Sequence, residues 1–118
     1  HSQDGMDEIS TSAPTTAAWV TPNKVRMTVI RPRSLGLKAT QNQDLFVSSV
    51  KNSKSRAQNI LANKEKGPAR DTIVLNAAYG LLVCKKARNV REGIALAQKS
   101  IDSGSALNVL EQLKKRSK

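Results

Sequence analysis

The sequence predicts an α/β fold made of a loop, a β-hairpin and about four helices. Residues 16–20 read as a possible strand, and residues 25–29 alternate apolar and polar side chains with a period of two, which is typical of a strand. From residue 55 onward, apolar residues instead recur at helical spacing. Aromatic residues make up only 3% of the chain, so the core must be aliphatic, which suits helices packed on a sheet.

The hairpin is the first regular element expected along the chain. Residues 16–20 form one strand, and residues 21–24 form a turn because they contain Pro and Asn, which turns favour. In the next strand, Val25, Met27 and Val29 alternate with polar residues. This alternation predicts a half-buried strand with one face against a core.

Helices follow the hairpin. The first has Ser55 as its candidate N-cap and places Ile60 and Leu61 on one face. Gly67-Pro68 marks a break and the start of the second helix, since Pro is tolerated in the first turn. The third helix has Asn89 as its N-cap and ends at Gly104, and its apolar face contains Val90, Ile94, Ala97 and Ile101. A last helix begins at Ser105, with Ala106, Leu110 and Leu113 facing inward.

The segment 73–84 of the second helix is apolar almost all round, which predicts burial on every side. Cys84, the only cysteine, is therefore expected to be a small buried hydrophobic residue. Asn76 in the same segment must find structural hydrogen-bond partners. A two-stranded sheet is a poor sheet on its own, and a helix that is apolar on every side needs neighbours on every side. We therefore expect further packing partners.

Charge and composition limit the classes of function. The net charge is +11, yet residues 1–23 hold three acids and no Lys or Arg, so all 20 basic residues follow them. Such a chain attracts polyanions, either nucleic acid or a phosphorylated metabolite with its metal. Nucleic acid is the less favoured partner, because aromatic stacking platforms and any helix-turn-helix or zinc pattern are lacking. No apolar run of about 18 residues occurs, so no transmembrane helix is expected.

The loop Asp4-Gly5-Met6-Asp7-Glu8 carries the most informative chemical pattern. Mg²⁺ prefers one or two carboxylates together with waters and substrate phosphates. Neighbouring side chains on an extended loop point in roughly opposite directions, so Asp7 and Glu8 could each hold an ion or bracket a diphosphate between two ions. The same pair also fits an ordinary solvated turn, and the pattern alone leaves both readings open.

This loop, with Ser10 and Pro14-Thr15 after it, resembles the DG-x-DE-x-S…GPT segment of the anthranilate phosphoribosyltransferases. Further motifs resemble that family in the same order: residues 32–37, Asp44-Leu45, Gly67-Pro68-Ala69-Arg70-Asp71, Leu75-Asn76-Ala77-Ala78, residues 92–97 and Ile101-Asp102-Ser103-Gly104. The series is more specific than any one of its members. The departures from the family pattern are Ala13 for Gly, Ser34 for an acidic residue, Leu35 for Phe, Ser48-Ser49 for Gly-Gly and Arg56 for Asn.

The resemblance implies transfer of the phosphoribosyl group from phosphoribosyl pyrophosphate to anthranilate, in tryptophan biosynthesis. It identifies Asp7 and Glu8 as the magnesium-binding pair with Mg²⁺ as cofactor, and no residue as catalytic or as a known substrate contact. Residues 1–118 would be the C-terminal section of a nucleoside-phosphorylase/phosphoribosyltransferase-like α/β domain, without its N-terminal portion and helical dimerisation domain. The intact family forms homodimers, and an intracellular location, cytoplasm or plastid, is expected.

Other functions remain open from the sequence. A pyrimidine nucleoside phosphorylase of the same fold is disfavoured by the acidic pair, since phosphorolysis needs no paired magnesium. A small basic nucleic-acid-binding protein would account for the net charge of +11. A vestigial structural fragment without activity would account for the apparent shortage of packing partners.

We expect residues 1–118 alone to have no measurable transferase activity. The resemblance places the family's glycine-rich phosphate-binding loop and its anthranilate contacts upstream of this segment. A steady-state assay with both substrates and Mg²⁺ checks the expectation, and normal turnover would refute it.

Overall fold

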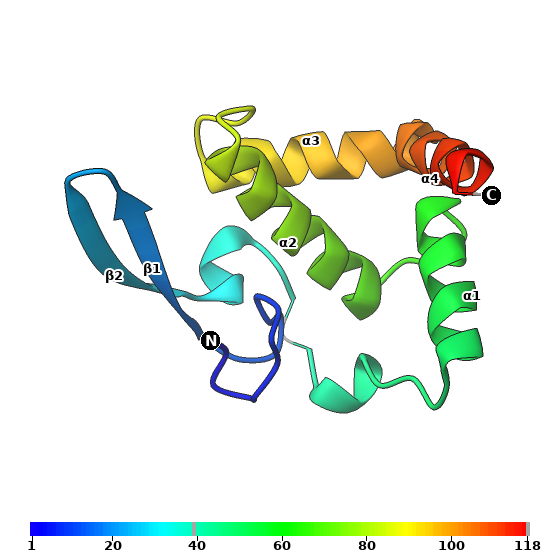
Figure 1. The fold of residues 1–118 in the computed structure, drawn as a ribbon. Coiled ribbons are helices and arrows are strands. Elements are labelled where there is room, and N and C mark those ends of the chain that lie inside the picture. Colours follow the sequence, from blue (N-terminus) through cyan, green and yellow to red (C-terminus); the bar gives the residue numbers. More distant parts are fainter. Residues whose placement is uncertain (39, 118) are drawn as a thin grey trace.

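A computed structural model describes residues 1–38 and 40–117, and these fold into the predicted loop, β-hairpin and four α-helices (Figure 1). The elements are β1 (Thr15–Thr21), β2 (Lys24–Ile30), the 3₁₀ turns η1 (Pro32–Leu35) and η2 (Asn42–Asp44), α1 (Val50–Leu61), α2 (Pro68–Val83), α3 (Val90–Asp102) and α4 (Ser105–Arg116). The hairpin projects from one side of the helices, while α4 packs at the far end of α3 near α1 (Figure 1). Over the described ranges, no helix combines the length and the apolar character needed to cross a membrane.

The hairpin has the predicted strands and turn. β1 and β2 pair antiparallel, with Thr21 opposite Lys24, so Pro22 and Asn23 form a two-residue turn. The expectation that β2 is half-buried is wrong: Val25 and Met27 are each 63% exposed. The alternation is present, but within the described residues no other layer covers that face of the sheet. The hairpin therefore has the alternating pattern of a half-buried sheet, but within the described residues its apolar face is not packed against another layer.

Helix α1 begins earlier than predicted. Ser49, not Ser55, is the N-cap, and its hydroxyl accepts a hydrogen bond from the Asn52 N–H at 3.2 Å. Ser55 lies exposed inside the helix. The sequence has several Ser and Asn residues in this stretch, and each is an acceptable cap, so local preference alone does not select one.

Helix α2 begins at Pro68 as predicted, but only part of its surface is buried. Val74, Leu75 and Ala78 have no exposed surface, since α3 and the loops cover that side. Val83, in contrast, is 68% exposed, and Cys84 is exposed as well, so the predicted burial of both the whole segment and its cysteine is wrong. An apolar groove lies along the uncovered side of α2, and Cys84 is part of its lining.

The core lies where α2 crosses α3. It contains the buried side chains of Ile60, Val74, Ala78, Ile94, Ala97 and Ile101. The α3 signals are confirmed: Asn89 caps the helix by accepting the Glu92 N–H at 2.9 Å, and the predicted apolar face is the buried one. Helix α4 covers only the end of this core, and its Leu113 is 59% exposed rather than inward-facing.

The α2–α3 crossing depends on a residue without a side chain. A Cβ placed on Gly93 of α3 would lie 2.7 Å from the carbonyl oxygen of Ala78 and 3.0 Å from its Cα. Both neighbours are backbone atoms of α2, so neither can move without separating the helices. Gly80, in the exposed part of α2, has nothing within 4 Å of the same position.

We expect Gly93→Ala to destabilise the fold by about 1–3 kcal/mol, because it overpacks the crossing. Gly80→Ala is the matched control and should be neutral or stabilising by about 0.5–1 kcal/mol, since it only improves helix propensity. Urea denaturation followed by circular dichroism measures both. Equal effects of the two substitutions would contradict the close packing at Gly93.

Candidate metal-binding site

The acidic loop is attached to α2 through the side chain of Asn76. The Ile9 N–H donates to Asn76 Oδ1 at 3.0 Å, and Asn76 Nδ2 donates to the Ile9 carbonyl oxygen at 2.9 Å. The same Nδ2 also donates to the Thr72 carbonyl oxygen at 2.9 Å. The amide thus satisfies both backbone groups of Ile9, as a neighbouring strand would. This confirms the structural role predicted for Asn76.

A second attachment lies one helical turn away on the same face of α2. The hydroxyl oxygens of Thr11 and Thr72 are 2.8 Å apart, and the Thr72 hydroxyl donates to the Pro68 carbonyl oxygen at 3.0 Å. Since Thr72 has only one hydroxyl proton, Thr11 is the donor between the two. Thr11 is only 2% exposed. The loop is therefore held on both sides of Ser10.

The base of the loop is closed by backbone pairing. The Gln3 N–H donates to the Pro14 carbonyl oxygen at 3.0 Å, and the Thr16 N–H donates to the His1 carbonyl oxygen at 2.8 Å. Ser2 and Thr15 lie opposite each other in this short antiparallel bridge and are buried. Residues 4–13 are therefore a closed loop that begins and ends at the start of β1.

Asp4 organises the inside of the loop. Its carboxylate accepts hydrogen bonds from the Ser10 hydroxyl at 2.6 Å, from the Ser12 hydroxyl and from the Met6 N–H at 3.3 Å. Burial by itself would raise the pKa of Asp4, but these hydrogen bonds outweigh it and hold the pKa far below its usual range. Gly5 follows with φ of +84°, a left-handed conformation that favours glycine and allows a sharp turn.

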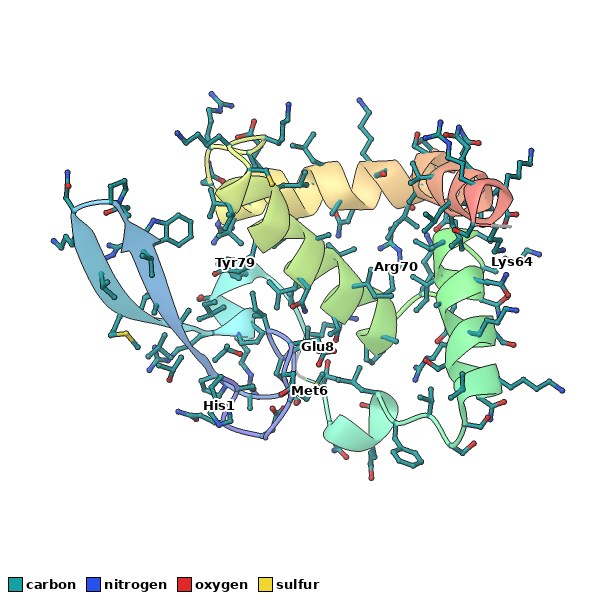
Figure 2. The ribbon with its side chains drawn as sticks, in the orientation of Figure 1. His1, Met6, Glu8, Lys64, Arg70 and Tyr79 are labelled. Carbon is teal, nitrogen blue, oxygen red and sulfur yellow. The ribbon has the colours of Figure 1, made fainter. Side chains whose placement is uncertain are left out.

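Asp7 and Glu8 are both exposed on this loop, after the turn. Glu8 lines a cavity of about 320 Å³ between the loop, α1 and α2, whereas Asp7 is not part of its lining. Figure 2 shows Met6 and Glu8 on the side of the loop nearest the helices, with His1 on the other side. The two carboxylates thus have different surroundings.

The donor set fits a hard cation with an open coordination shell. The described residues contain no group of three or more His, Cys, Asp or Glu side chains that could hold a metal ion. Two neighbouring carboxylates nevertheless match the way Mg²⁺ binds, through one or two carboxylates with waters and substrate phosphates in the remaining positions. Asp7 and Glu8 are the residues that would hold it.

Arg56 is the charged neighbour of Glu8 around the same cavity. Its Nε lies 2.7 Å from Glu65 Oε1, and its Nη2 donates to the Asp44 carbonyl oxygen at 2.9 Å. Arg56 therefore ties α1 to the segments before and after it. Leu45 and Val47 also line this cavity, while Phe46 between them is 75% exposed and does not contribute to the core.

The sequence patterns do not predict the residues that hold the loop in shape, Asp4 and Thr72 among them. One signal was available: Ser10 and Ser12 follow Asp4 closely, and Ser hydroxyls near an Asp in a loop are frequent hydrogen-bond donors to it. No sequence signal pairs Thr11 with Thr72, because these residues are 61 positions apart.

Comparisons with known proteins agree on one family. The model of the glycosyl transferase family, a/b domain, matches residues 1–107. The anthranilate phosphoribosyltransferase of Desulfitobacterium hafniense (strain Y51) is 40% identical over 112 residues, which are 95% of this chain and 33% of that protein. The corresponding protein of Thermomicrobium roseum is 41% identical over 117 residues, 97% of this chain and 33% of that protein. The chain thus spans about a third of the length of these relatives.

Solved structures give the same result. The chain is similar to anthranilate phosphoribosyltransferase from Saccharomyces cerevisiae in complex with 4-fluoroanthranilate, with a TM-score of 0.81 and 28% identity over 92% of this chain and 32% of that one. The structure of the yeast protein in complex with PRPP and Mg has a TM-score of 0.80 and 27% identity over 92% of this chain and 31% of that one.

The hydrogen bonds to Asp4 predict a pH dependence of stability. A carboxyl group whose pKa is lowered by folding contributes stability above its unfolded pKa, and that stability is lost as the pH falls. We expect the contribution of Asp4 to decrease once the pH falls below about 4. Asp4→Asn should reduce the change in unfolding free energy between about pH 5 and pH 2 in urea titrations. Asp7→Asn, an exposed Asp in the same loop, is the control and should keep the wild-type slope.

Proposed function

The chain belongs to the glycosyl transferase family, whose α/β domain it matches over residues 1–107, and on that premise we propose that it supplies the magnesium-binding loop of an anthranilate phosphoribosyltransferase. The relatives that it matches at about 40% identity have this activity in their names. The substrates would be phosphoribosyl pyrophosphate and anthranilate, and the cofactor Mg²⁺. Residues 1–118 would form part of a larger catalytic domain, together with a region equivalent to the rest of the relatives' length.

The reaction is a displacement at the anomeric carbon of the ribose. The bond from this carbon to the diphosphate oxygen breaks, the bond to the anthranilate nitrogen forms, and one proton leaves the nitrogen. Charge develops on the diphosphate as it departs. Mg²⁺ held by Asp7 and Glu8 would supply the neutralising charge.

The role of this chain is to present two carboxylates in a fixed position. Asp7 and Glu8 follow a turn that Gly5 allows, and the Asp4 hydrogen bonds hold that turn in shape. The observation that carries the proposal is the attachment of the loop to α2 through Asn76, because it places two exposed carboxylates on a rigid support. A solvated turn without function would not need such an attachment.

Glu8 faces the cavity and Asp7 does not, so the two carboxylates suit different positions around a diphosphate. In one arrangement, Asp7 and Glu8 would each hold a different Mg²⁺ ion. In the other, the pair would hold two ions that bracket the diphosphate between them. No residue of this chain is assigned to proton transfer. A homodimer and a location inside the cell, in the cytoplasm or a plastid, accompany the proposal.

The test is the double variant Asp7→Asn/Glu8→Gln in the full-length enzyme. Removing both charges should lower kcat/KM by at least about 100-fold at low Mg²⁺, because the ions that neutralise the leaving diphosphate lose their ligands. The Mg²⁺ concentration needed for half-maximal rate should also rise. A Mg²⁺ titration of the steady-state rate measures both effects.

Glu111→Gln is the matched control, since Glu111 is an acid on the surface of α4, where it pairs with Lys114 at 2.7 Å. It should leave the rate and the Mg²⁺ dependence unchanged. An unaltered Mg²⁺ dependence in the Asp7/Glu8 double variant would contradict the proposed metal-binding role.

A further inference from the structure

A second cavity touches the acidic loop and contains no acid. It has a volume of about 290 Å³ and is lined by residues 11–14 of the loop and by residues 31–33, which follow β2. It shares no lining residue with the cavity that contains Glu8. Whatever binds here therefore contacts a different set of residues of the same loop.

The charged groups that line this second cavity are the side chains of Arg31 and Arg33. Both are exposed, and neither forms an ion pair with any described residue. The turn between them is fixed, because Pro32 is buried and Gly36 closes the turn by donating to the Arg33 carbonyl oxygen at 3.2 Å. Two arginines without a printed ion pair therefore line one cavity, and its lining includes no Asp or Glu.

A third arginine strengthens the positive field at this turn. Arg91 of α3 donates from Nη2 to the Ser34 carbonyl oxygen at 3.0 Å, which attaches the turn to the helical body. Asp4 of the loop does not line this cavity, and its carboxylate accepts hydrogen bonds from Ser10 and Ser12. Ser12 lines the cavity as well, so the hydroxyl of a lining residue donates to that carboxylate.

We propose that Arg31 and Arg33 form a binding site for a phosphate dianion, either free phosphate or the phosphate group of a small metabolite. Guanidinium groups bind phosphate oxygens through paired N–H donors, and they are more easily desolvated than ammonium groups. The cavity is larger than a phosphate ion alone requires, so it also accepts the carbon skeleton of a phosphate monoester. This site is additional to the Asp7/Glu8 loop and does not depend on the proposed transferase activity.

The experiment is a calorimetric titration of the full-length protein with inorganic phosphate, without Mg²⁺, at about pH 8 and low ionic strength. We expect saturable binding that Arg31→Gln and Arg33→Gln each weaken by about tenfold, as loss of a charge-assisted hydrogen bond predicts. Arg26→Gln is the matched control, because Arg26 is an exposed arginine of the preceding strand β2 and does not line this cavity. It should bind phosphate as the wild type does.

A second arm of the experiment distinguishes the two sources of the phosphate group. Tighter binding of ribose 5-phosphate than of inorganic phosphate would identify a phosphate monoester as the ligand, while equal binding would identify free phosphate. The Asp7→Asn/Glu8→Gln variant should bind either probe normally, which separates this site from the metal-binding loop. Absence of saturable binding, or equal weakening by all three arginine substitutions, would overturn the proposal.

Discussion

The pair of hydrogen bonds between the Asn76 amide and the backbone of Ile9 is the constraint on which the candidate site depends. A long loop has no regular hydrogen-bonding pattern of its own, so its shape must be imposed by other parts of the chain. Here a single side chain on α2 satisfies both backbone groups of one loop residue, at 2.9 and 3.0 Å. The Asp4 hydrogen bonds then shape the loop locally, so the backbone that carries Asp7 and Glu8 is attached to α2 on one side and to the Asp4 turn on the other.

Much of the fold is predictable because it follows from local chemistry. The Pro22-Asn23 turn, the start of α2 at Pro68 and the Asn89 cap each depend on residues within a few positions of one another. Such preferences act through backbone dihedral angles and nearby hydrogen bonds, so they depend little on tertiary contacts with the rest of the chain. The start of α1 was missed because neighbouring serines offer equivalent caps.

Burial was less predictable, because it depends on what lies across a surface rather than along the chain. Val25 and Met27 alternate as in a covered strand, yet both are largely exposed. Cys84 lies in an apolar run, yet it is exposed beside an open groove. The chain thus carries apolar surfaces on the hairpin and on α2 that the described residues leave uncovered. In the candidate site, Asp7 and Glu8 are predicted from a resemblance, whereas the long-range contact between Thr11 and Thr72 has no local signal.

Helix α2 performs two tasks with residues only two positions apart. Asn76 holds the loop on one face, and Ala78 accepts the close approach of Gly93 on another. Successive helical residues are rotated by about 100° around the axis, so inserting or deleting one residue between these positions would turn one face away from its partner. Changes in chain length are therefore incompatible with this stretch. The spacing between Asn76 and Ala78 therefore sets the orientation of the acidic loop relative to α3.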